Sequence, residues 1–160
     1  MKRLLLISLV FFTCVAPAFA QNSPLLTFEE LLETFKRGYD VKGTFYYAKC
    51  EFYVDEKKVE NAPDIVGGMN IDFFEYFGRN AAKNSKAFIT FSESKMIENP
   101  VGSGYVYNYV KVRVYEDGTV SINVRLLDPR TLENKKQERF ETKLYDGNLK
   151  TAGAYFFVSH

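Results

Sequence analysis

The apolar positions of the chain change pattern twice, and each pattern predicts a different element. The first pattern is an almost unbroken apolar run over residues 4–15, which follows two basic residues and ends before Pro17. Ala18 and Ala20 then place small residues at the two positions that a signal peptidase reads. The run is shorter than the ~20 residues that a membrane-spanning helix needs. The pattern predicts a signal peptide over 1–20, and therefore an exported protein that is periplasmic or secreted.

The second pattern is helical and begins at Thr27. Thr27 and Glu30 have the spacing of a capping box, in which side chains satisfy backbone amides at the helix start. The apolar residues that follow recur at intervals of three and four: Phe28, Leu31, Leu32 and Phe35. Gly38 is expected to end the helix. The segment 27–38 therefore predicts one short helix that buries a single face.

From Val41 onward the pattern changes to the two-residue alternation of strands. The first predicted strand covers 44–54, with four side chains on one face: Tyr46, Ala48, Cys50 and Phe52. The polar segment 55–64 is predicted to be a loop. Two more strands are expected over 69–77 and 87–97.

The clearest alternation follows in 105–115 and 120–126. Between these segments, Asp117 and Gly118 favour a two-residue hairpin turn, because both tolerate the positive φ angles that such turns need. The last predicted pair of strands covers 137–145 and 149–158.

These elements predict an α+β fold that is predominantly β, with one N-terminal helix packed on an antiparallel meander of about seven strands. Short turns leave little room for helical crossovers, so neighbouring strands are expected to be antiparallel. A closed or half-closed barrel is favoured over a flat sheet, since a flat sheet exposes its edges. Residues 21–160 contain no internal repeat or linker and are predicted to form a single domain.

Composition narrows the class of protein without indicating an activity. The chain has 160 residues, of which 46% are apolar and 26% charged, and this balance is typical of a globular domain. Removal of the predicted signal peptide takes away two of the 21 basic residues and none of the 20 acidic ones, which leaves a net charge of −1. This charge gives no reason to expect a nucleic-acid partner.

The predicted signal peptide also contains Cys14, so Cys50 is the single thiol of the predicted mature chain. In an oxidising compartment a lone thiol is either buried or paired with another chain. The apolar strand pattern around Cys50 favours burial, and hence a monomer. A disulfide-linked dimer through Cys50 is the alternative.

No residue pattern predicts a catalytic, cofactor-binding or metal site. The single histidine is His160 at the chain end, where an imidazole lacks neighbours that would fix its orientation in a triad. Ser92 and Lys95 match a Ser-x-x-Lys pattern, but a strand places them on opposite faces. No motif brings together the carboxylates that could act as a pair: Asp72, Glu75 and Glu93. The protein is therefore expected to be no enzyme and to need no cofactor.

Two surface features are candidates for partner binding. Tyr105, Tyr107 and Tyr109 lie on one face of a predicted strand, and Arg113 continues this face. Tyrosine offers a wide apolar contact with a polar tip and is enriched at recognition surfaces. The alternative is a half-buried face covered by the helix. The second feature is a basic loop whose interleaved acids favour an ordinary solvated surface: Arg130, Lys135, Lys136 and Arg139, with Glu133 and Glu138.

Seven short segments run in order through nearly the whole predicted mature chain: Thr27-Phe28-Glu29-Glu30-Leu31-Leu32, Cys50, Gly67-Gly68-Met69-Asn70-Ile71-Asp72, Phe91-Ser92-Glu93-Ser94, Asp117-Gly118-Thr119-Val120, Leu127-Asp128-Pro129 and Tyr155-Phe156-Phe157. In their order and spacing they resemble the VirK family of exported proteins from host-associated Gram-negative bacteria. The resemblance implies an association with virulence or host interaction. It supplies no catalytic residue and no cofactor.

These observations favour an exported, non-enzymatic interaction module that binds a macromolecular partner. The candidate partner-binding residues are Tyr105, Tyr107, Tyr109 and Arg113. Neither a nucleic-acid partner nor a transmembrane segment beyond the signal peptide is expected. An alternative from another class is a carrier that encloses a small apolar ligand inside a β-barrel, because aromatic side chains can line such a cavity.

Overall fold

The computed structural model describes residues 23–158. They form one α-helix, α1 (Phe28–Lys36), and one strongly curved sheet with the strand order β5-β2-β11-β10-β9-β8-β7-β6. The signal peptide predicted over 1–20 and the single histidine, His160, lie outside the described residues.

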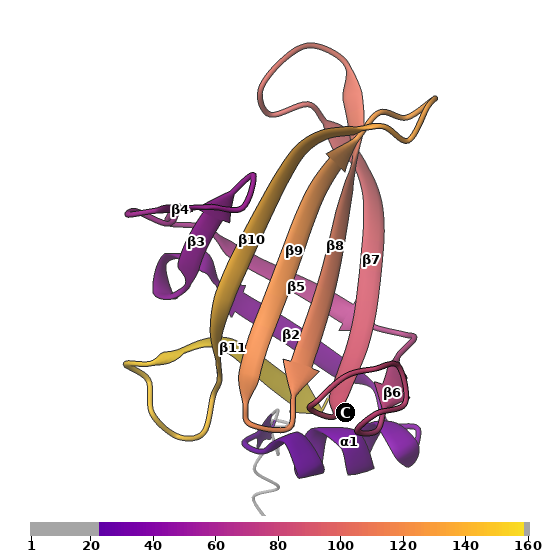
Figure 1. The fold of residues 1–160 in the computed structure, drawn as a ribbon, viewed down its shortest axis with the longest axis vertical. Coiled ribbons are helices and arrows are strands. Elements are labelled where there is room, and N and C mark those ends of the chain that lie inside the picture. Colours follow the sequence, from indigo (N-terminus) through magenta and orange to yellow (C-terminus); the bar gives the residue numbers. More distant parts are fainter. Residues whose placement is uncertain (1–22, 159–160) are drawn as a thin grey trace, which may run out of the picture.

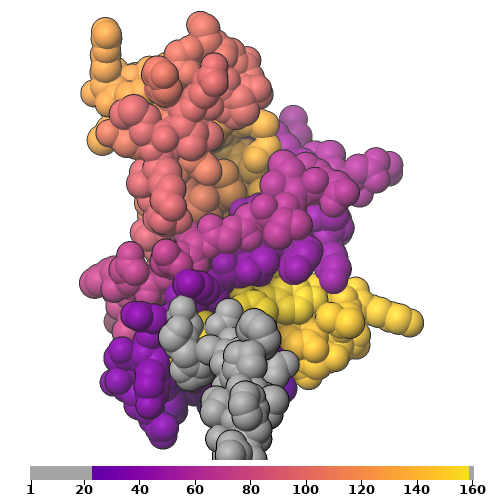
Figure 2. Space-filling view, turned by 180° about the vertical axis from the view of Figure 1, so that it is seen from behind, coloured from indigo at the N-terminus to yellow at the C-terminus, as the bar shows by residue number. Residues whose placement is uncertain are grey.

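The curved sheet has two layers that cross each other (Figure 1). Four long strands make up the long layer: β7 (Phe88–Glu98), β8 (Tyr105–Tyr115), β9 (Thr119–Leu127) and β10 (Asn134–Leu144). Three shorter strands make up the cross layer behind it: β2 (Val41–Tyr46), β5 (Val66–Ile71) and β11 (Ala152–Val158). From behind, the cross layer runs obliquely over the lower part of the long strands (Figure 2). The result is a predominantly β half-barrel with one N-terminal helix, as the sequence predicts.

Short elements complete the architecture. β1 (Pro24–Leu25) pairs with β11, and β6 (Glu75–Phe77) pairs with β7. β3 (Glu51–Val54) pairs with β10 and with β4 (Lys57–Val59).

The core lies between the two layers and consists largely of aromatic rings. Phe45 of β2 and Phe156 of β11 meet edge to face with their ring centroids 6.0 Å apart. Phe91 of β7 lies 5.8 Å from Phe156, again edge to face. All three side chains are buried. Such aromatic pairs add about 0.5–1.5 kcal/mol each beyond simple apolar burial, so they hold the cross layer on the long layer.

Helix α1 closes the lower end of the half-barrel (Figure 1) and confirms the sequence prediction. Thr27 is the N-cap, and its hydroxyl accepts a hydrogen bond from the amide of Glu30 at 3.1 Å. The Glu30 carboxylate accepts a hydrogen bond from the amide of Leu26 at 2.7 Å. In a standard capping box it would accept from the amide of the N-cap residue, which here is Thr27. The buried side chains are the predicted ones: Phe28, Leu31, Leu32 and Phe35. Gly38 follows the helix with φ +75°, a left-handed conformation that glycine adopts easily.

The single strand predicted over 44–54 is wrong, because the chain turns from one layer to the other within it. β2 ends at Tyr46, a 3₁₀ turn η1 (Tyr47–Lys49) follows, and β3 starts in a new direction. β2 pairs with β11 and β5, whereas β3 pairs with β10. The predicted common face is broken as well, since Tyr46 is exposed and Tyr47 is buried. Strand propensity reflects how well a residue fits into a sheet. It does not indicate where the chain leaves one layer and enters another.

Three other predicted boundaries differ from the structure. The segment 55–64, predicted to be a loop, contains β4. The segment 69–77, predicted to be one strand, contains the last residues of β5 and all of β6. These two strands lie at opposite edges of the sheet. The hairpin between β8 and β9 has a three-residue loop rather than a two-residue turn. Gly118 alone in that loop has a positive φ, +74°, and its amide donates to the carbonyl of Tyr115 at 2.9 Å.

The last predicted pair of strands is not a hairpin. β10 and β11 pair in parallel over two residue pairs, with an irregularity between Lys143 and Leu144. β11 pairs antiparallel with β2 and β1 instead. The predicted antiparallel meander is therefore correct for the long layer and wrong where the chain enters the cross layer.

Gly153 lies at this junction between the layers. Its buried amide donates to the hydroxyl of Thr142 at 2.9 Å. A Cβ at position 153 would lie 2.6 Å from that hydroxyl oxygen and 3.1 Å from both Cys50 Sγ and the carbonyl oxygen of Tyr46. The approach of β11 to β10 and η1 therefore requires a glycine here.

The N-cap can be tested with Thr27→Ala, which removes the hydroxyl that accepts from Glu30. The free energy of unfolding, measured by urea denaturation, should fall by about 1 kcal/mol. Thr34→Ala, in the last turn of the same helix, is the control and should change it by less than about 0.5 kcal/mol. Equal losses for the two variants would contradict the capping role.

The junction can be tested with Gly153→Ala. Because the added methyl group meets the Thr142 hydroxyl, the free energy of unfolding should fall by about 1–3 kcal/mol. Gly68→Ala on β5 is the matched control, since its nearest neighbour would be the carbonyl oxygen of Gly43 at 3.4 Å, an ordinary contact. A Gly153→Ala variant as stable as the control would show that the junction tolerates a side chain.

Candidate functional site

The outer face of the long layer carries the tyrosines that the sequence marks as candidates. Alternate residues of β8 point into the core and are buried: Val106, Val112 and Val114. The residues between them face outward. Tyr105 is 66% exposed, and Tyr107 and Tyr109 are half-buried. Helix α1 packs into the core at the lower end of the half-barrel (Figure 1), so it does not cover this face as the alternative interpretation expected.

Strand pairing brings further polar side chains to the same face. Tyr109 lies opposite Arg125 of β9, and Lys111 lies opposite Asn123. Five side chains line a pocket of about 240 Å³, called here the basic pocket: Tyr109, Lys111, Arg113, Asn123 and Arg125. Two of the four predicted partner-binding residues, Tyr109 and Arg113, therefore belong to one concave site.

The three cations of the basic pocket have no acidic partner among the described residues. The ion pairs of residues 23–158 involve other side chains, and none includes Lys111, Arg113 or Arg125. The guanidinium carbon of Arg113 lies 5.3 Å from the ring centroid of Phe88. The Nε atom of Arg113 is buried and donates to no acceptor. A buried donor without an acceptor is rare in folded proteins.

The sequence interpretation found only part of this pocket. Alternation along β8 could have added Lys111, since it lies between Tyr109 and Arg113 on the same face. Arg125 and Asn123 are on the next strand, and their position depends on the register of the β8–β9 hairpin. A one-residue shift of that register would place both on the core face.

Three of the four cations of the basic loop considered in the sequence pair with acids, whereas Arg130 has no ion pair among the described residues. The shortest pair of each is Lys135 with Asp128, Lys136 with Glu138 and Arg139 with Glu141, at N–O distances of 3.5, 2.6 and 2.8 Å. Lys135 also pairs with Glu133 at 3.9 Å, and Arg139 with Glu56 at 3.1 Å. This pattern supports the interpretation as an ordinary solvated surface.

The remaining sequence motifs do not gather into a site. Ser92 lies opposite Lys111 in the β7–β8 pairing, whereas Lys95 is on the other face and pairs with Glu93 at 2.9 Å. Within residues 23–158, no group of three or more His, Cys, Asp or Glu side chains could hold a metal ion.

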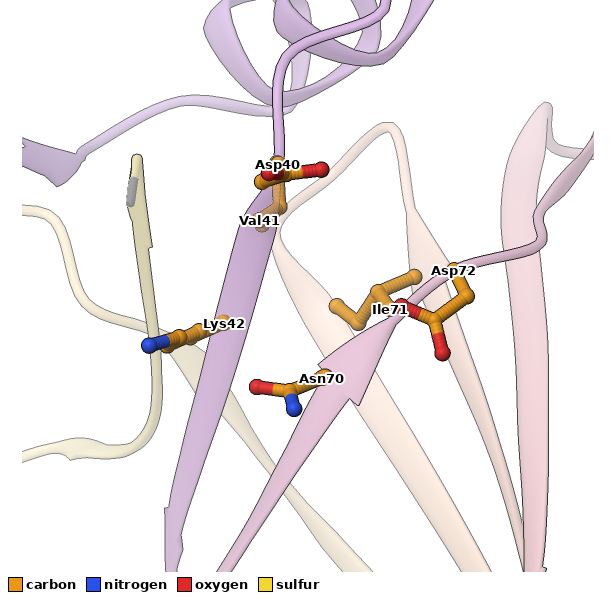
Figure 3. Close-up of a pocket in the computed structure, with 6 residues that line it drawn as sticks. All are labelled: Asp40, Val41, Lys42, Asn70, Ile71 and Asp72. Atoms are coloured by element: carbon orange, nitrogen blue, oxygen red, sulfur yellow. The ribbon is translucent and has the colours of Figure 1, made fainter. Parts of the chain in front are cut away.

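Another pocket of about 240 Å³ lies between the ends of β2 and β5 (Figure 3). Its polar lining residues are Asp40, Lys42, Asn70 and Asp72. Figure 3 shows these side chains spread along the two strands rather than turned toward one point. The pocket mixes both signs of charge on the edge strand of the sheet, which is typical of a solvated groove.

Cys50 lies between η1 and β3 and is half-buried, so the burial predicted from its apolar neighbours is only partial. Its Sγ lies 3.4 Å from the carbonyl oxygen of Tyr46. Burial raises the pKa of the Cys50 thiol to about 11, against a smaller lowering by a hydrogen bond with Thr142. The thiol is therefore almost fully protonated at neutral pH and is a weak nucleophile.

The fold and the outer face define a class: a small half-barrel protein whose candidate site is an uncovered sheet face with tyrosines and unpaired cations. The family model described as VirK protein matches residues 24–132. This chain belongs to the VirK family, which confirms the resemblance found in the sequence.

A solved structure supports the shared fold. The crystal structure of a VirK family protein from Legionella pneumophila has a TM-score of 0.63 to this chain, at 16% sequence identity, and the alignment covers 84% of this chain and 98% of that one. No curated protein matches the sequence. None of the helical structure in residues 23–158 has the length and apolar character to cross a membrane.

The raised pKa of Cys50 can be tested by alkylation of the chain that starts at Gln21. The pKa of about 11 is two units above the ordinary value of 9.0, so the native thiol has about 100-fold less thiolate at pH 8 than the urea-unfolded thiol. Iodoacetamide reacts with the thiolate and should therefore label the native thiol about 100-fold more slowly. The native rate should rise about tenfold per pH unit between pH 8 and 10. Equal native and unfolded rates at pH 8 would contradict the burial of this thiol.

Proposed function

We propose that this VirK family protein is exported and acts, without catalysis, as a binding protein for a macromolecular partner in the periplasm or outside the cell. The partner binds the outer face of the long layer, at Tyr105, Tyr107, Tyr109 and Arg113. The apolar run over 4–15 and the small residues before position 21 support export. An association with virulence or host interaction is in keeping with the family.

One observation carries the binding proposal: three tyrosines stand in a row on an uncovered sheet face, next to cations without acidic partners. Tyrosine and arginine are the residues most enriched among the energetically dominant contacts of protein interfaces. The row is rigid because β8 is paired with β7 on one side and β9 on the other. A preorganised surface loses little conformational entropy when a partner binds.

The alternative function, a carrier of a small apolar ligand, has less support. The rings of Phe45, Phe91 and Phe156 occupy the space between the layers. The hollow that reaches this region between β5 and β8 measures about 110 Å³. Typical ligand pockets have volumes of about 300–1,000 Å³. A lipid-sized adduct retained in native mass spectrometry of the purified protein would favour the carrier over the binding module.

The proposal predicts that Tyr105→Ser, Tyr107→Ser and Tyr109→Ser together weaken partner capture while the fold stays intact. A photo-reactive phenylalanine analogue is incorporated at position 107 in the cells that produce the protein. On illumination it should form a covalent adduct with the partner, which identifies the partner. The triple variant should then recover that partner at least about tenfold less well than the unmodified protein, since hot-spot truncations cost 2 kcal/mol or more.

Tyr39 and Phe73 provide the control, because they are 54% and 68% exposed and lie outside the long layer. A photo-reactive group at position 39 should give no such adduct, and Tyr39→Ser with Phe73→Ser should leave capture unchanged. Full capture by the triple tyrosine variant, with an unchanged circular dichroism spectrum, would remove this face from consideration.

A further inference from the structure

We propose that the basic pocket binds a phosphate monoester, a tetrahedral group with two negative charges, through Lys111, Arg113 and Arg125. This inference rests on the proposed function, because the phosphate group would anchor the macromolecular partner on the outer face of the long layer. The pocket has about 240 Å³ of space, which is enough for the phosphate group with one ester substituent leaving it.

The charge of the pocket favours an anion. Lys111 and Arg113 are two residues apart on one face of β8, and Arg125 lies diagonally across from Lys111 on β9. Three positive charges at this spacing repel one another, and this repulsion favours the binding of a counter-charge.

An acid on β10, the strand next to β9, is already paired. Glu141 of β10 lies opposite Ser121, accepts from Arg139 at 2.8 Å and also accepts from the Ser121 hydroxyl at 2.9 Å. Arg139 also pairs with Glu56 at 3.1 Å, so it compensates the charge of Glu141 only in part.

The donors of the pocket suit a phosphate better than a carboxylate. A carboxylate has two oxygens, whereas a phosphate monoester presents three terminal oxygens and a charge near −2. Arg113 contributes the terminal amino groups of its guanidinium group. Arg125 and Lys111 add further charged donors, and charge-assisted hydrogen bonds are about twice as strong as neutral ones.

Arg113 is held in place before any ligand binds. Its guanidinium group lies over the ring of Phe88 at 5.3 Å. Phe88 itself is buried and stacks on Phe77 with ring centroids 4.8 Å apart. This contact limits the side-chain conformations that Arg113 can adopt.

The row of tyrosines gives the direction of the ester substituent. Tyr109 lines the pocket, and Tyr107 and Tyr105 continue the same face toward the start of β8. A phosphate held by the three cations therefore places the rest of the partner along the tyrosines. The site predicts a phosphate ester as ligand rather than free inorganic phosphate.

The test is an NMR titration of the ¹⁵N-labelled chain from Gln21 at pH 8 in low chloride. Three probes are used: phenyl phosphate, inorganic phosphate and dimethyl phosphate. Phenyl phosphate and inorganic phosphate are dianions at this pH and should shift the amides of 109–113 and 121–125. Dimethyl phosphate carries one charge and should bind at least about tenfold more weakly.

Phenyl phosphate should bind more tightly than inorganic phosphate because its ring contacts the tyrosines. Tighter binding of inorganic phosphate would overturn the ester assignment.

Variants identify the residues. Arg113→Gln and Arg125→Gln should each weaken phenyl phosphate binding about tenfold, and Arg113→Lys should fall between wild type and Arg113→Gln because it keeps the charge and loses the fork. Lys58→Gln removes one charge at a distant pair with Glu51 and should change the affinity less than about twofold. Equal affinity for the three probes, or an Arg113→Gln effect no larger than that of Lys58→Gln, would overturn the phosphate site.

The anchoring role is tested separately with the cross-linked partner. Arg113→Gln with Arg125→Gln should reduce partner capture, as the tyrosine variant does. Capture that depends on the tyrosines but not on these arginines would overturn the anchoring role and leave the proposed function standing. The opposite result is that the tyrosine variant still binds phosphate and still captures the partner fully. That result would overturn the proposed function and leave the phosphate site standing.

Discussion

The contact between Gly153 and Thr142 determines how the two layers of this protein meet. The amide of Gly153 donates to the Thr142 hydroxyl at 2.9 Å, and Cys50 and Tyr46 close the space where a side chain would stand. This close approach lets β11 leave β10 after two parallel residue pairs and cross behind the long strands. The cross layer then brings Phe45 and Phe156 onto Phe91, and the core forms between the layers. A side chain at this position would press on Thr142, Cys50 and Tyr46 and strain the junction between the layers.

The same bend decides which face of the long layer is free. Because the cross layer covers only the inner side, Val106, Val112 and Val114 of β8 are buried, whereas the tyrosines, Lys111 and Arg113 between them stay at the surface. β8 and β9 are central strands, so Tyr109, Lys111 and Arg125 are held by hydrogen-bonded neighbours on both sides. Functional groups on paired strands are held more firmly than groups on loops. A rigid face with uncompensated positive charge is well suited to bind an anionic part of a larger partner.

Prediction from the sequence succeeded where the physical signal is local. The capping residues and apolar spacing of 27–38 define a helix within a few turns of chain, and the structure places Thr27 and the four buried side chains as expected. The alternation of β8 also placed its tyrosines and Arg113 on one face. Prediction failed at Tyr47, at β4 and at β11, because a corner, a short edge strand and a parallel pairing depend on residues distant in the sequence.

The sequence by itself determined the helix, the strand-rich character, the common face of Tyr105, Tyr107 and Tyr109, and the family to which the chain belongs. These properties follow from spacing along one segment, where side-chain direction repeats with the backbone. Only the tertiary structure decided that Arg125 and Asn123 join that face and that Gly153 sets the bend. Strand register and layer crossing are fixed by the packing of the whole core, and no single segment contains that information.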